Sequence, residues 1–172
     1  MSTALSMNGL VNDEADKFEK LKSLVDKIRF CMMTTIGLDG VMHSRPMSFL
    51  EWSEEGNLLF FTKASSTTMR QIESQRTVNL GFCDPSHNVY VSISGEARVL
   101  NDAALKEKLF AAIMKNWFPG GPEDPSLRLV SVIANNAEYW EGLSGFALLL
   151  SLAKARLTDT PQDLGEHTSF LL

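Results

Sequence analysis

The chain has 172 residues, of which 44% are hydrophobic, and this is enough to bury the core of one domain. Its formal net charge of -5 results from 21 acidic and 16 basic residues without a basic run, which argues against a nucleic-acid-binding surface. No segment approaches the roughly 20 apolar residues of a membrane-spanning helix, and the N-terminal residues lack the pattern of a signal peptide. We therefore expect a cytoplasmic protein without nucleic-acid or membrane partners.

The first part of the chain predicts one helix followed by a β-hairpin. Apolar residues recur at helical spacing from Asp13 to Ile28, so we expect a helix there and a tail over residues 1–12. Phe30 to Ile36 and Val41 to Trp52 have the composition of strands, and Asp39-Gly40 between them is typical of a tight hairpin turn.

The next segment places many hydroxyl groups between two apolar strands. Leu58 to Thr62 predicts a strand, Ser65 to Thr68 opens a short helix, and Thr77 to Cys83 predicts another strand. The free N–H groups and the positive dipole end of such a helix suit a phosphate group. Ser66 and Thr68 are equally suited to capping the helix, and the two roles are compatible.

The second half of the chain continues the pattern of antiparallel strands. A run from Val89 alternates apolar and polar residues, and Gly95 within it indicates a bulge. Asp102 predicts the start of a helix that continues to about Asn116, and a further strand begins at Leu127. Over residues 143–172 we expect a C-terminal helix, at Phe146 to Leu157, and then a polar tail.

The two cysteines lie in apolar, strand-like segments. Cys31 and Cys83 have neither a CxxC spacing nor a histidine at a metal-binding distance in the sequence. We therefore expect two buried free thiols, no disulfide and no metal site.

Four motifs, in order along the chain, resemble the pyridoxamine 5'-phosphate oxidase-like split barrels and, among them, the general stress protein branch. The motifs are His43-Ser44-Arg45-Pro46-Met47; Phe61-Thr62 through Ser66 with Gln71-Ile72-Glu73 and Arg76 to Leu80; Lys115 to Gly121; and Ala137 to Gly142. The resemblance covers residues 13–142, which would form one flavin-binding domain. It implies an α+β, mainly β fold, a six-stranded antiparallel split β-barrel with flanking helices.

The same resemblance implies a flavin cofactor, FMN with FAD as the alternative, in a homodimer that holds the flavin at the subunit interface. The cofactor-binding residues that it implies are Arg45, Pro46, Met47, Phe61, Thr62, Lys63, Ser66, Thr67, Thr68 and Trp117. In the family, the arginine reaches the flavin phosphate and its strand lies along the ring. On sequence alone Arg45 is as well explained as an exposed cation, and Trp117 as a core aromatic.

Two departures from the family pattern qualify this hypothesis. Thr67 and Thr68 stand where the oxidases have basic residues, which predicts weaker flavin binding because charge-assisted contacts are lost. Lys63 and Arg70 are candidates to compensate. The segment from Leu143 to Phe146 lacks the arginine and histidine that bind pyridoxal phosphate in the true oxidases, so we do not expect pyridoxamine phosphate oxidation.

Two classes of function follow from these observations. The first is a flavin-dependent oxidoreductase of unknown substrate, in which the cofactor carries the chemistry; we therefore name no catalytic residue, because the sequence shows no general base. The second is a non-catalytic stress-response protein that binds flavin or haem.

Overall fold

The computed structural model describes residues 4–142 and 165–172, with side chains from Asp13 to Gly142 and from His167 onward. The elements in chain order are α1 (Ala4–Ile28), β1 (Phe30–Ile36), β2 (Met42–Trp52), β3 (Leu58–Lys63), α2 (Thr67–Ser74), β4 (Thr77–Asp84), β5 (Val89–Leu100), α3 (Ala103–Leu109), the 3-10 helices η1 (Ala112–Asn116) and η2 (Gly121–Glu123), β6 (Leu127–Gly142) and β7 (Gly165–Leu171).

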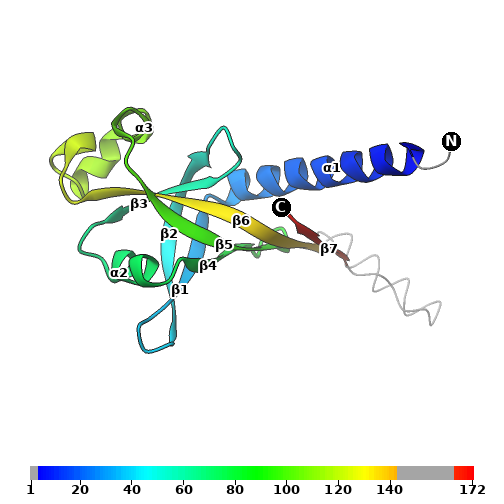
Figure 1. Ribbon diagram of the computed structural model, residues 1–172, viewed down its shortest axis with the longest axis horizontal. Helices are drawn as coiled ribbons and strands as arrows, with labels where there is room; N and C mark the ends of the chain where they lie inside the picture. Colours follow the sequence, from blue (N-terminus) through cyan, green and yellow to red (C-terminus); the bar gives the residue numbers. More distant parts are fainter. Residues whose placement is uncertain (1–3, 143–164) are drawn as a thin grey trace.

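Six of these strands form a closed antiparallel barrel, as predicted. The strand order is β3-β2-β1-β4-β5-β6, and a further pairing between β3 and β6 closes the ring (Figure 1). The hairpin of β1 and β2 projects from one end of the barrel, and α2 lies beside it (Figure 1). The mainly β, six-stranded split-barrel prediction is therefore confirmed.

The barrel interior is filled by large apolar side chains from alternate strand positions. Phe49 lies at its centre and makes edge-to-face contacts with Trp52, Phe60 and Phe82, at ring-centroid distances of 5.6, 6.0 and 6.3 Å. Such aromatic pairs contribute about 0.5–1.5 kcal/mol each beyond the area that they bury. The packed interior fixes the strands that carry the candidate site.

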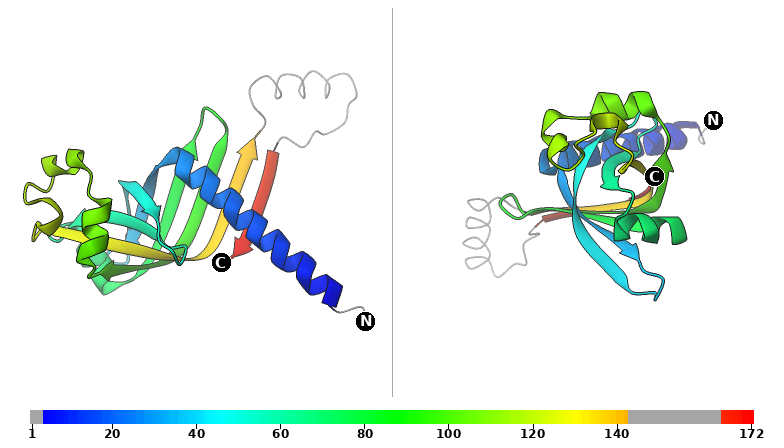
Figure 2. Two further views of the ribbon diagram at one scale, coloured as in Figure 1. Left: turned by 90° about the horizontal axis from the view of Figure 1, so that it is seen from above. Right: turned by 90° about the vertical axis from the view of Figure 1, so that its left-hand side faces the viewer.

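Helix α1 packs one apolar stripe against the sheet and extends past the barrel (Figure 2). Leu21, Leu24 and Val25 on this stripe are buried, and Lys20 forms an ion pair with Glu141 of β6 at 2.6 Å. The helix begins at Ala4 rather than Asp13, so most of the predicted N-terminal tail is helical. Within the described part of the chain, no helix is both long enough and apolar enough to cross a membrane.

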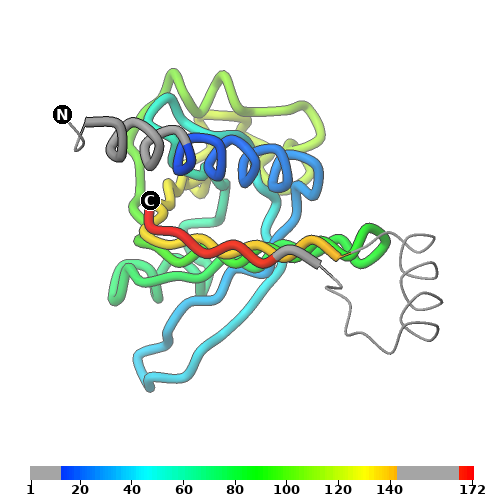
Figure 3. Tube along the Cα trace, turned by 90° about the vertical axis from the view of Figure 1, so that its right-hand side faces the viewer, coloured from blue at the N-terminus to red at the C-terminus, as the bar shows by residue number. Residues whose placement is uncertain are grey.

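Strand β7 is a feature that the sequence did not predict. It pairs with the second half of β6, where a C-terminal tail was expected, and its Phe170 packs against Tyr139 with ring centroids 6.5 Å apart. Main-chain hydrogen bonds to the free edge of β6 provide the pairing, so a mostly polar sequence suffices. Figure 3 shows β7 alongside β6, with α1 on one side of this sheet. The helix predicted at Phe146 to Leu157 falls outside the described residues.

In the segments that connect the strands, the predicted turn and bulge are present, but the predicted helix is shorter than expected. Gly40 has a φ of 78° in the hairpin turn, and β5 and β6 shift register between Ser94 and Gly95, so the turn and the bulge are both confirmed. Asp102 caps α3 by accepting a hydrogen bond from the Leu105 N–H at 2.9 Å. The single helix expected from Asp102 to about Asn116 is wrong in extent. α3 ends at Leu109, the backbone is extended at Phe110, and a separate 3-10 helix, η1, follows.

Candidate functional site

Three polar side chains from β1, β2 and α2 meet beside the middle of α2. Arg45 Nη1 donates to Thr35 Oγ1 at 2.5 Å, and Arg45 Nη2 donates to Gln71 Oε1 at 2.8 Å. Thr35 Oγ1 in turn donates to Gln71 Oε1 at 2.5 Å. Thr35 and Gln71 are buried and Arg45 is half-buried. These bonds, here called the Arg45 cluster, join the projecting hairpin to α2.

The charge of Arg45 has neutral partners in this cluster. Both of its hydrogen bonds end on uncharged oxygens, and no carboxylate pairs with it among the described residues. Desolvation by partial burial lowers the pKa of the Arg45 guanidinium. Cations removed from water are normally paired with an anion in proteins, because an unpaired buried charge is costly. The cluster therefore holds a cation that suits an anionic ligand.

The first turn of α2 directly precedes Gln71, the α2 member of the Arg45 cluster, and offers hydrogen-bond donors. Ser66 is the N-cap, and its Oγ accepts from the Met69 N–H at 3.1 Å and lies 3.2 Å from Thr62 Oγ1. The Arg70 N–H donates to the Ser66 carbonyl. The N–H groups of Thr67 and Thr68 have no acceptor within the helix, as is general for the first turn. The predicted helix start is confirmed; of the two candidate caps, Ser66 is the N-cap, whereas Thr68 lies inside the helix.

The two threonines that replace basic residues are not equivalent. Thr67 is exposed, and its hydroxyl accepts from Arg70 Nη2 at 3.2 Å. Thr68 is only 6% exposed, so its side chain is shielded from solvent. Thr67 can therefore present both its hydroxyl and its N–H to a ligand, whereas Thr68 is placed to present mainly its N–H.

Phe61 and Lys63 lie on the other face of β3 from Thr62, because successive side chains of a strand alternate. The ring of Phe61 packs against Phe110, with centroids 6.4 Å apart. The charge of Lys63 contributes to the lowered pKa of Asp124, after hydrogen bonds from Ser126 and Gly120. Among the described residues, no hydrogen bond, ion pair or ring contact joins either side chain to the Arg45 cluster.

The remaining predicted residues are spread over β2 and the loop after η1. Pro46 is exposed opposite Met32, and Met47 is half-buried against the core. Trp117 is largely exposed at the end of η1, and no hydrogen bond or ring contact within the described ranges joins it to β2 or α2. The sequence did not single out Thr35 or Gln71 for the site, since a buried threonine and glutamine carry no distinctive pattern.

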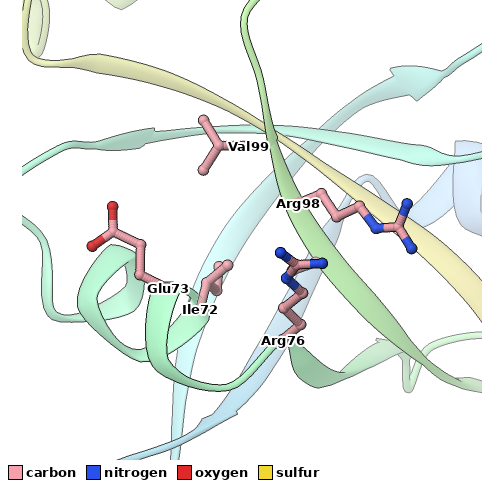
Figure 4. A pocket seen from close by; sticks show the side chains of 6 residues that line it. Ile72, Glu73, Arg76, Arg98 and Val99 are labelled. Carbon is pink, nitrogen blue, oxygen red and sulfur yellow. The ribbon is translucent and has the colours of Figure 1, made fainter.

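Two pockets flank α2. One, of about 320 Å³, lies between the N-terminal half of α2 and the turn of the β1–β2 hairpin and is lined by Gly37, Leu38, Asp39, His43, Thr67, Arg70 and Gln71. The other, of about 360 Å³, is lined by Ile72, Glu73, Arg76, Ala97, Arg98 and Val99 (Figure 4). Of the two, the first, here called the hairpin pocket, shares Gln71 with the Arg45 cluster and Thr67 with the start of α2. No group of candidate metal ligands occurs in the described residues.

The outward face of the sheet carries exposed apolar side chains. Phe30 and Met32 on β1, Tyr90 on β5 and Trp140 on β6 are exposed, and Trp140 stacks on His167 of β7 at 4.9 Å. Cys83 is exposed as well, so the expectation that it is buried was wrong: its neighbour Phe82 takes the inward position on β4. Cys31 is buried, and both cysteines are free, as predicted.

Comparison with known proteins agrees with this architecture. Among curated proteins, the chain is 30% identical to protein bli-3 of Neurospora crassa over 133 residues, which cover 72% of this chain and 64% of that protein. It is 27% identical to general stress protein 26 of Bacillus subtilis over 125 residues, covering 70% of this chain and 85% of that protein. The chain thus spans less than two thirds of bli-3.

Solved structures show the same fold. A putative general stress protein 26 from Jannaschia sp. CCS1 superposes with a TM-score of 0.76 at 22% identity, covering 92% of this chain and 99% of that chain. The general stress FMN/FAD binding protein from Xanthomonas citri gives a TM-score of 0.64 at 29% identity, covering 74% and 89% of the two chains. The sequence profile described as "Pyridoxamine 5'-phosphate oxidase like" matches residues 16–163. With most of its length matched by this profile, the chain belongs to the pyridoxamine 5'-phosphate oxidase-like family.

Proposed function

We propose that this protein is a flavin-binding stress protein that holds a flavin nucleotide by its phosphate between Arg45 and the start of α2. The observation that carries the proposal is the half-buried Arg45 guanidinium, whose partners are both neutral. The description of the Xanthomonas citri relative as an FMN/FAD binding protein supports the choice of ligand.

The residues at the start of α2 fit a phosphate group. The N–H groups of Thr67 and Thr68 and the Thr67 hydroxyl would donate to its oxygens, with the positive end of the helix dipole behind them. Arg45 would supply the charge, while Thr35 and Gln71 hold its side chain in place. The flavin, when bound, supplies the hydride or electron transfer, and the protein binds and orients it. We propose an oxidoreductase role on this basis.

Flavin titration of the wild type and an Arg45→Met variant tests the phosphate assignment. FMN should bind more tightly than riboflavin, which lacks the phosphate. Arg45→Met should weaken FMN by tenfold or more, about 1.5–3 kcal/mol for a charge-assisted contact, and leave riboflavin nearly unchanged. Arg76→Met, which removes an exposed arginine beyond the other end of α2, is the matched control. Equal losses for both flavins would show that Arg45 acts through folding.

The different burial of the two threonines gives a second test of the same site. Thr67→Lys adds a cation at an exposed position, so it should tighten FMN several-fold, and less so at high salt because the attraction is screened. Thr68→Lys forces a charged side chain into a buried position and should lower stability. If Thr68→Lys tightens FMN as strongly as Thr67→Lys at no cost in stability, the assignment of the two positions is wrong.

We also propose that the outward face of the sheet forms a homodimer interface. Phe30, Met32, Tyr90 and Trp140 expose apolar surface there, and such surface on a soluble protein usually marks an interaction site. The family resemblance implies that the flavin lies next to this interface, so the partner subunit would complete the groove.

One spectroscopic experiment distinguishes the oxidoreductase role from a role in flavin binding alone. Flavin-loaded protein should lose its flavin absorbance on anaerobic addition of NADH or NADPH and regain it in air. A flavin that stays oxidised with both donors would favour the non-catalytic carrier role.

A further inference from the structure

We infer that the hairpin pocket receives the adenylate half of a dinucleotide flavin, so that FAD rather than FMN is the preferred ligand. This inference rests on the proposed flavin site and extends it beyond the phosphate. The pocket is continuous with that site, because Thr67 belongs to both and Gln71 both lines the pocket and binds Arg45.

The charges at the site match two singly charged phosphates better than one doubly charged phosphate. A terminal phosphate ester such as that of FMN carries about 1.5 to 2 negative charges at pH 7, whereas each phosphate of a pyrophosphate diester lacks the second ionisation. Because Thr67 and Thr68 stand where the oxidases have basic residues, these two positions supply no cation. Among the described residues, Arg45 is then the one half-buried cation near the start of α2. One guanidinium is suited to one negative charge.

A second cation, Arg70, lies at the hairpin pocket and next to the first residue of α2. Arg70 lines the hairpin pocket, and its Nη2 donates to Thr67 Oγ1 at 3.2 Å, which holds the guanidinium near the helix start. Its hydrogen-bond partner there is neutral, as are those of Arg45. Arg45 is bonded to Gln71 and Arg70 to Thr67, one helical turn apart on α2, so a pyrophosphate leading into the pocket would meet both cations.

The far wall of the pocket suits a flat base. Leu38 exposes an apolar side chain on the hairpin turn, and His43 on β2 presents an exposed imidazole ring across from α2. Nucleic-acid bases stack on aromatic and histidine rings in protein sites, and apolar neighbours shield the stack from water. The pocket volume of about 320 Å³ leaves room for a base.

Calorimetric titrations with riboflavin, FMN and FAD test the inference. Wild-type protein should bind FAD at least about fivefold more tightly than FMN, the lower end expected for stacking one base. Leu38→Ser and His43→Ala should each remove most of that advantage and leave the FMN affinity unchanged. Arg70→Gln should weaken FAD about threefold or more, as expected for an exposed charge contact.

Two control variants outside the pocket test whether the effects on FAD affinity are specific to the pocket residues. Val41→Ser removes another exposed apolar side chain from the same hairpin but not from the pocket, and Arg76→Gln removes an exposed arginine beyond the C-terminal end of α2. Neither should change the ratio of FAD to FMN affinity. Thermal melting of each variant without ligand checks that it is folded.

The outcomes distinguish this inference from the proposed function. FMN binding that equals or exceeds FAD binding overturns the adenylate assignment and leaves the flavin site intact. An FAD preference that survives both Leu38→Ser and His43→Ala also overturns it. Failure of the folded protein to bind any of the three flavins overturns the proposed function and the inference with it.

Discussion

Replacement of Gln71 by methionine tests whether the Arg45 cluster holds α2 in place. Gln71 Oε1 accepts from both Thr35 and Arg45, and methionine has a similar size but no strong acceptor. The Thr35 hydroxyl is fully buried, so it would lose its acceptor at a cost of about 1–3 kcal/mol. Arg45 is half-buried and can turn its N–H groups to water, which adds about 1 kcal/mol or less. We expect a total loss of about 2 kcal/mol.

Urea unfolding measures this loss of stability as a lower transition midpoint with an unchanged m-value. Gln75→Met, at the exposed C-cap of the same helix, should change stability by less than about 0.5 kcal/mol. Adding Arg45→Met to Gln71→Met should cost about 1 kcal/mol less than the sum of the single variants, because the two residues share a charge-assisted bond. If Gln71→Met is as mild as Gln75→Met, or if the double variant is additive, the cluster does not stabilise α2.

Three further predictions concern the sheet. Gly95→Ala would place a Cβ 2.1 Å from the Ile133 carbonyl oxygen, so we expect a loss of at least about 3 kcal/mol in urea, whereas Gly81→Ala, with its nearest atom at 3.9 Å, should be neutral. Tyr90→Arg should convert the proposed homodimer to a monomer in sedimentation; a wild type that is already monomeric at micromolar concentration contradicts the interface. Burial raises the pKa of the Cys31 thiol to about 12, whereas Cys83 is exposed on the proposed interface. In the Tyr90→Arg variant, where that interface should be open, a thiol reagent at pH 8 should label Cys83 and leave Cys31 unmodified. Equal labelling rates for the two cysteines would refute this prediction.

The strands and the start of α2 could be predicted because local chemistry determines them. Asp39-Gly40 sets the hairpin turn, Gly95 sets the bulge, and Ser66 has the side chain that an N-cap requires. These signals lie within a few residues of the structure that they specify. Together with the ordered motifs, they were enough to predict the barrel.

What the sequence did not predict depends on contacts between distant parts of the chain. β7 forms because the edge of β6 is free to pair, and nothing in the sequence of residues 165–171 indicates that edge. Thr35, Arg45 and Gln71 come from three different elements, and only the fold brings their side chains together. For the same reason the sequence could not show that Thr67 is exposed and Thr68 buried.

The short length of α2 has a consequence for how tightly any ligand binds. A helix of eight residues is not stable alone, so its order depends on the Ser66 cap, on buried residues such as Ile72 and on the Arg45 cluster. We therefore expect the amides of α2 to exchange with solvent by local opening, well before those of β4 or β5. The N–H groups that would donate to the phosphate exist as a set only while α2 is docked, so each opening lowers the apparent affinity. A bound nucleotide should in turn slow amide exchange in α2 more than elsewhere in the barrel.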